Sequence, residues 1–122
     1  DVTLIATGHL VWEALLAADA LENQGISAEV LNIHTIKPLD NDAILASVRK
    51  TGCVVSCEEH NYLGGLGESV ARVLSLNHPA PQEFVATNDT FGESGTPEEL
   101  MKKYGLDAVA IEKAVQRVLK RK

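Results

Sequence analysis

The segment that decides the fold of this chain is Cys53–Ala71, CVVSCEEHNYLGGLGESVA. A short apolar run at its start is followed by two acids and a histidine, three glycines within four residues, and a new helical pattern. This order predicts a buried strand, a polar turn and a helix start. In an open α/β sheet such a turn lies at the carboxyl end of the strand, where ligands and partners dock. The glycines allow the backbone to turn tightly and to approach a neighbour closely.

Motifs and composition exclude several classes of function. The GGLG segment lacks the full GxGxxG fingerprint, and GxxxxGK[ST] does not occur. The formal net charge of −6 argues against nucleic acid or an anionic membrane as the main partner. No apolar run approaches the length of a membrane span, and no signal peptide is visible. The 122 residues suit one domain, residues 1–122, and the absence of an initiator Met predicts a piece of a longer chain.

The two cysteines indicate a reducing compartment. Cys53 and Cys57 stand four apart on one predicted strand, roughly 13 Å at 3.3 Å per residue. A disulfide needs Cα atoms within about 7 Å, so we expect free thiols and a cytoplasmic location. A zinc site is not expected, because the four histidines show no i, i+4 pair and no CxxC companion (His9, His34, His60 and His78).

Apolar patterning predicts strands alternating with helices. The expected strands are 2–7, 28–33, the run beginning at 53, and 83–86; the expected helices are 11–23, 41–50, 66–76, a short one beginning at 96, and 108–122. Asp40 and Asp107 suit N-caps, Thr96 suits the start of a capping box, and Gly25 suits a helix stop. In the first helix we expect Val11, Leu15 and Ala18 to face inward.

This alternation predicts an α/β fold of three layers. We expect a mainly parallel sheet of four strands in the order 2-1-3-4, with helices on both faces. The crevice at the topological switch would be lined by residues 8–10 and 58–65. A flavodoxin-like module that binds a small anion or nucleotide in this crevice is one alternative.

Four segments together resemble the C-terminal domain of transketolases, in the thiamine-diphosphate-dependent transketolase-like family. They are TGHLVWEAL (7–15), LNIHTIKPLD (31–40), EEHNYLGGLGE (58–68) and SGTPEELMKKYGLD (94–107). The same domain type closes the β subunits of 2-oxoacid dehydrogenases and deoxyxylulose-phosphate synthase, which remain alternatives. The resemblance implies a five-stranded mixed sheet whose antiparallel edge strand precedes residue 2, so we expect four strands and an open edge.

The resemblance also implies that this domain is part of a larger enzyme in which other domains carry out the chemistry. The family transfers a two-carbon ketol unit between sugar phosphates through thiamine diphosphate and Mg²⁺, which the preceding domains bind with a GDG…N motif. That motif is absent here, so we expect this domain to bind neither cofactor nor metal and to be inactive alone. Its expected partners are the catalytic domains, in an enzyme that is a homodimer.

Nine polar or glycine residues are candidates for contacts with those partners: His9, Lys37, Glu58, Glu59, His60, Asn61, Tyr62, Gly64 and Gly65. Glu59 and His60 could act as acid and base, but docking across a domain boundary is favoured. Lys37 could reach a sugar phosphate, although a lysine in such a turn is more often solvated. An exposed pair of Trp12 and Tyr62 would indicate an interface.

Overall fold

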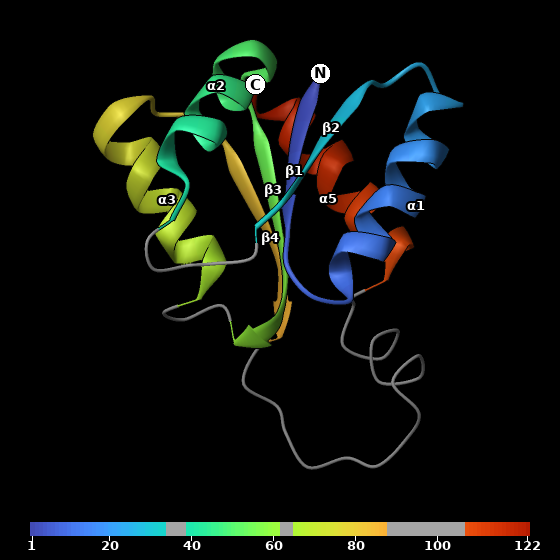
Figure 1. The fold of residues 1–122 in the computed structure, drawn as a ribbon. Helices are drawn as coiled ribbons and strands as arrows, with labels where there is room; N and C mark the ends of the chain where they lie inside the picture. The colour runs from blue at the N-terminus through green and yellow to red at the C-terminus, as the bar shows by residue number, and fades with distance from the viewer. Residues whose placement is uncertain (34–38, 62–64, 88–106) are drawn as a thin grey trace.

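Four parallel strands form the centre of the molecule, as the alternation of elements predicts (Figure 1). The computed structural model describes residues 1–33, 39–61, 65–87 and 107–122. The strands are β1 (Val2–Ala6), β2 (Ala28–Asn32), β3 (Val54–Asn61) and β4 (Gln82–Thr87). Their order is β2-β1-β3-β4 and each pair is parallel, so the predicted order 2-1-3-4 is confirmed. Within the described residues, β2 and β4 are the edge strands.

Helices cover both faces of the sheet and give the predicted three layers (Figure 1). They are α1 (Leu10–Glu22), α2 (Asn41–Thr51), α3 (Leu66–Asn77) and α5 (Ala108–Lys120). Alternation along β1 sends Leu4 to the core under α1 and α5, and Ile5 to the core under α2 and α3. No described helix has both the length and the apolar composition that a membrane crossing requires.

Local end signals were read correctly from the sequence where the structure describes them. Asp40 accepts a hydrogen bond from the Ala43 N–H (3.1 Å), and Asp107 accepts one from the Ala110 N–H (3.0 Å). Gly25 has φ +80°, which suits a residue that stops a helix. The capping box expected at Thr96 lies outside the described residues.

The inner face of α1 was predicted wrongly at Leu15, whereas Val11 and Ala18 do pack against the core. Its buried residues are Leu10, Ala14, Ala17 and Leu21, whereas Leu15 is 45% exposed and Val11 and Ala18 are only half-buried. The helix is apolar around most of its circumference, so the spacing of apolar residues alone did not identify the face that meets the sheet. A row of apolar side chains therefore remains on the outside of the molecule.

Both cysteine thiols are free and buried, and we expect them to be unreactive in the folded chain. Burial, reinforced by the nearby negative charge of Glu58, raises the pKa of the Cys57 thiol well above its usual range. Burial likewise raises the pKa of Cys53. Because the thiolate is the reactive form, Ellman's reagent at pH 8 should modify neither thiol until urea unfolds the protein. An introduced Ser75→Cys, at an exposed position of α3, should react at once; rapid labelling of Cys57 without urea would contradict the packing described.

A group of ion pairs ties the edge strand β4 to α5 and should make stability depend on pH. The Glu83 carboxylate accepts hydrogen bonds from Arg117 (2.9 Å) and Arg121. Partial burial alone would raise the pKa of Glu83, but these two guanidinium groups outweigh it and the pKa is lowered. A carboxyl with a lowered folded-state pKa stabilises the protein above its unfolded-state pKa of about 4.3, and this contribution is lost as the pH falls through the folded-state pKa.

We expect Glu83→Gln to lower the free energy of unfolding by about 1 kcal/mol at pH 7, and by much less at pH 3. Urea unfolding at the two pH values measures the difference. Glu29→Gln is the comparison: Lys50 also lowers the pKa of Glu29, but this single pair is more exposed than the pairs of Glu83, so its loss should be smaller. A loss at pH 3 as large as that at pH 7 would show that the ion pairs are not its cause.

Candidate functional site

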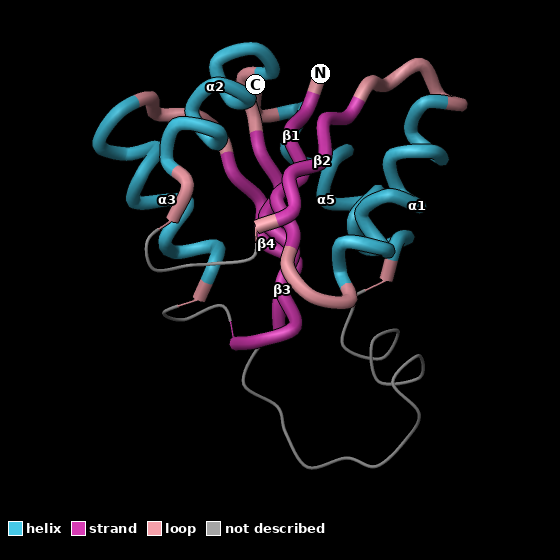
Figure 2. The backbone as a smooth tube through the Cα atoms, in the orientation of Figure 1, coloured by secondary structure: helices cyan, strands magenta, loops and turns pink. Residues whose placement is uncertain are grey.

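The carboxyl ends of β1 and β3 lie side by side at the topological switch of the sheet. The last residue pair between these strands is Ala6 with Cys57, after which β1 turns into α1 through Gly8 and His9. β3 continues to Asn61, and Figure 2 shows it running past the end of β1. This end of the sheet is where the sequence placed the candidate interface residues.

The polar turn expected at Glu58–His60 is instead part of β3. The strand extends through Asn61, which pairs with Thr87 of β4 after an irregularity in the register. Because side chains alternate between the two faces of a strand, Ser56 and Glu58 both lie on the face of β3 that α3 covers. The acid that follows the apolar run therefore points into the domain and does not begin a surface turn.

Glu58 forms the N-terminal cap of α3 from outside the helix. Its side chain is 1% exposed, and its carboxylate accepts hydrogen bonds from the Leu66 N–H (3.0 Å) and the Gly67 N–H (2.6 Å). The residue at the N-cap position, Gly65, has no side chain to perform this task. A carboxylate at this position satisfies two otherwise unpaired N–H groups and lies at the positive end of the helix dipole.

The cap has a direct consequence for ligand binding. The free N–H groups of a helix N-terminus are a ready site for a phosphate or carboxylate. At α3 two of these groups already bind the buried carboxylate of Glu58. These two N–H groups are therefore not available to an external anion.

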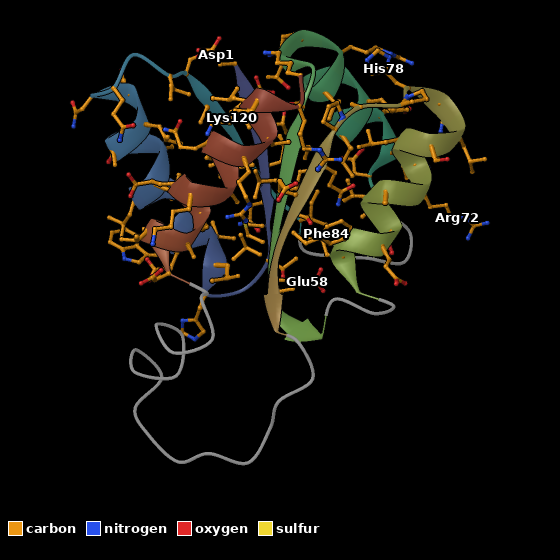
Figure 3. All side chains as sticks on the ribbon, turned by 180° about the vertical axis from the view of Figure 1, so that it is seen from behind. Asp1, Glu58, Arg72, His78, Phe84 and Lys120 are labelled. Atoms are coloured by element: carbon orange, nitrogen blue, oxygen red, sulfur yellow. The ribbon has the colours of Figure 1, made fainter. Side chains whose placement is uncertain are left out.

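Gly67 allows β3, α3 and β4 to pack closely around this cap. A Cβ atom at Gly67 would overlap the Phe84 ring and lie 2.9 Å from the Ser56 Oγ. The Gln82 side-chain amide donates hydrogen bonds to the Gly67 carbonyl oxygen (2.9 Å) and the Ser56 Oγ (3.1 Å). Figure 3 labels Glu58 and Phe84 near the carboxyl end of the sheet. Sequence reasoning missed this network; the third glycine of GGLG was its one visible signal.

The structure describes only part of the predicted site. His9 lies exposed in the turn before α1, and Gly65 lies at the N-cap of α3 beside the carboxylate of Glu58. The backbone of Glu59, His60 and Asn61 belongs to β3. Three other candidates, Lys37, Tyr62 and Gly64, lie outside the described residues, so their interface role stays a prediction.

Metal ligands do not gather in the part of the chain that the structure describes. Over residues 1–33, 39–61, 65–87 and 107–122, no group of three His, Cys, Asp or Glu side chains could hold an ion. Glu58, the buried acid at the carboxyl end of β3, is bonded to backbone N–H groups. These residues do not form the oxygen cluster that a magnesium diphosphate requires.

Comparison with known proteins identifies relatives over the whole chain. The family described as "Transketolase, C-terminal domain" matches residues 1–111. The 6-deoxy-6-sulfo-D-fructose transketolase subunit SqwH of Clostridium sp. (strain MSTE9) is 50% identical over 122 residues, which are all of this chain and 38% of that protein. Transketolase of Mus musculus is 40% identical over 117 residues, 95% of this chain and 19% of that protein.

A solved structure has the same fold at high similarity. It is described as a split gene transketolase, inactive beta4 tetramer, and it superimposes with a TM-score of 0.95 at 48% sequence identity. The match covers 98% of this chain and 39% of that chain. The chain thus spans well under half the length of these relatives.

Proposed function

The chain belongs to the family of transketolase C-terminal domains, and we propose that it serves as the assembly domain of a transketolase whose chemistry other domains carry out. One observation carries the proposal. At the carboxyl end of the sheet, the buried carboxylate of Glu58 and the N-terminus of α3 bind each other. Neither group is left to hold a cofactor, while the surrounding residues can still contact a neighbouring domain.

The proposed reaction of the complete enzyme is transfer of a two-carbon ketol unit between sugar phosphates. Thiamine diphosphate and Mg²⁺ would supply the adduct chemistry, bound by domains outside this chain. The described residues do not fit these groups, since they contain no cluster of metal ligands. In this proposal the residues of this domain carry out no catalytic step.

We propose that the enzyme is divided between two polypeptides. The solved relative is described as a split gene transketolase, and the half-identical relative is described as a subunit. The polypeptide that contains this domain would then pair with a complementary subunit, which binds thiamine diphosphate, and two such pairs would form the dimer. The two buried free thiols support a reducing compartment such as the cytoplasm.

Alanine substitutions at Glu59 and His60 test the assembly role. In the full-length protein mixed with the complementary subunit, the double variant should weaken association at least tenfold, measured by sedimentation velocity. Turnover at saturating concentrations of both subunits should stay near the wild-type value. Arg72→Ala, at an exposed position of α3, is the control and should change neither quantity.

The opposite result would reject the proposal. If assembly is unchanged while turnover collapses, Glu59 and His60 take part in the chemical step or in substrate binding. Calorimetry on the 122-residue chain tests the remaining alternative, in which the domain is a module that binds a small ligand. Tight binding of thiamine diphosphate, a sugar phosphate or FMN would favour that module over an assembly domain.

A further inference from the structure

Strand β3 contains more residues than its neighbour β4 near the carboxyl end of the sheet. Cys57 pairs with Val85, and the next pair along the strands is Asn61 with Thr87. Residues 58–60 of β3 therefore lie opposite a single residue of β4. Such a β-bulge disrupts the ladder locally, bends its strand and re-aims the side chains that it carries. We call residues 58–60 the β3 bulge; it includes Glu59 and His60.

The ladder constrains the β3 bulge less than it constrains the rest of the strand. Each residue from Val54 to Cys57 pairs with both β1 and β4. The last partner in β1 is Ala6, so β3 continues past the end of β1, as Figure 2 shows. Contacts outside the ladder must therefore contribute to the conformation of the bulge.

Glu58, the first residue of the β3 bulge, provides such a contact. Its carboxylate accepts hydrogen bonds from the Leu66 N–H (3.0 Å) and the Gly67 N–H (2.6 Å), and the residue is 1% exposed. Hydrogen bonds to a charged acceptor are about twice as strong as those between neutral groups. The side chain of Glu58 thus ties the bulge to the first turn of α3.

The first turn of α3 is itself held on a second side. The carbonyl oxygen of Gly67 accepts a hydrogen bond from the side-chain amide of Gln82 (2.9 Å), which also donates to the Ser56 Oγ (3.1 Å). Gly67 is therefore bonded to β3 through its N–H and to β4 through its carbonyl group. This turn is a fixed point to which Glu58 can anchor the bulge.

We propose that Glu58 is a positioning residue for assembly, which holds the backbone at Glu59 and His60 in the conformation that the complementary subunit binds. The proposal rests on the assembly function proposed above, in which Glu59 and His60 make the contact. Glu58 is buried, so it acts through these two neighbours. A binding segment that is already ordered loses less conformational freedom on association, which raises the affinity.

Hydrogen exchange tests whether Glu58 holds the bulge. Glu58→Gln keeps the size of the side chain but replaces one acceptor oxygen with an NH₂ donor. In the full-length variant the amide hydrogens of residues 59–61 should exchange at least tenfold faster, measured by mass spectrometry, while those of β1 keep their rates. Unchanged exchange at residues 59–61 would overturn the proposal.

Association with the complementary subunit tests the consequence for assembly. Glu58→Gln should weaken this association at least tenfold in sedimentation velocity. Glu83→Gln is the control, because Glu83 also accepts two hydrogen bonds, from Arg117 and Arg121, but joins β4 to α5. It should leave the association unchanged. Equal weakening by both variants would show that general destabilisation is the cause, and the positioning role would be rejected.

A double-mutant cycle distinguishes positioning from a merely structural role. If Glu58 acts through Glu59 and His60, its effect on association should disappear when both are alanine. In that background Glu58→Gln should weaken association by less than twofold, so the effects are not additive. A further tenfold loss would mean that Glu58 acts independently of these residues, contrary to the proposal.

Glu58→Asp serves as the second variant if Glu58→Gln does not fold. It keeps the charge but is one methylene shorter, so it can reach the Leu66 and Gly67 N–H groups only if the bulge moves toward α3. Association should again fall at least tenfold. Wild-type affinity in Glu58→Asp would contradict the positioning role.

The outcomes also separate this proposal from the proposed function. If alanine at Glu59 and His60 weakens association and neither Glu58 variant does, only the positioning role of Glu58 fails. If alanine at Glu59 and His60 leaves association unchanged, the assembly function fails and the positioning role fails with it.

Discussion

Replacing Glu58 with alanine should lower the free energy of unfolding by about 3 kcal/mol, one of the two largest losses we expect from a single substitution. The change removes a side chain that is 1% exposed and leaves the Leu66 and Gly67 N–H groups without their carboxylate. An unsatisfied buried donor costs about 1–3 kcal/mol, and the cavity adds to this. Urea unfolding followed by circular dichroism measures the loss.

Two comparisons identify the cause of that loss. Asp107→Ala removes the carboxylate that caps α5 and should cost only about 1 kcal/mol, because water can replace it at a less buried helix end. Formate, which presents two oxygens, should partly restore Glu58→Ala and leave Asp107→Ala unchanged. A loss below 1 kcal/mol for Glu58→Ala would contradict the capping role.

Gly67→Ala should destabilise the domain by roughly 2–3 kcal/mol through steric overlap. The new methyl group would meet the Phe84 ring and the Ser56 hydroxyl, and Phe84 packs there from the edge strand β4. The expected readout is a lower urea midpoint with an unchanged slope, which indicates lost stability without a change in the surface exposed on unfolding.

A second substitution tests the steric explanation. Phe84→Ala should recover part of the loss when combined with Gly67→Ala, so that the two effects are not additive. Gly25→Ala is the control for backbone strain alone, because Gly25 has φ +80° and no atom within 4 Å of an added Cβ. It should cost about 1 kcal/mol and show no rescue by Phe84→Ala. Strict additivity of Gly67→Ala and Phe84→Ala would contradict the overlap.

Local signals in the sequence were sufficient to predict the order of the strands and helices and where several of the helices begin. Asp40 and Asp107 cap helices that begin at the next residue, so the interaction is contained within four residues of sequence. Alternating strands and helices imply a parallel sheet for a similar reason, because each connection is short and its hand is fixed. These predictions needed no knowledge of distant contacts.

Features that depend on distant packing were not predictable in the same way. Glu58 accepts hydrogen bonds from N–H groups eight and nine residues further along the chain. The face of the sheet to which its side chain points follows only once β3 is known to extend to Asn61. The inner face of α1 was missed because apolar residues surround that helix and only contact with the sheet selects a side. The same excess of apolar residues leaves Trp12, Leu15 and Leu16 exposed on the outer side of α1.

The claim that this domain contributes assembly and leaves chemistry to other domains is tested most directly by turnover. The measurement is two-carbon ketol transfer between sugar phosphates, with thiamine diphosphate and Mg²⁺ present. We predict no turnover by the 122-residue chain alone, and full turnover when the full-length protein is combined with the complementary subunit. Ketol transfer by the 122 residues alone would contradict the account.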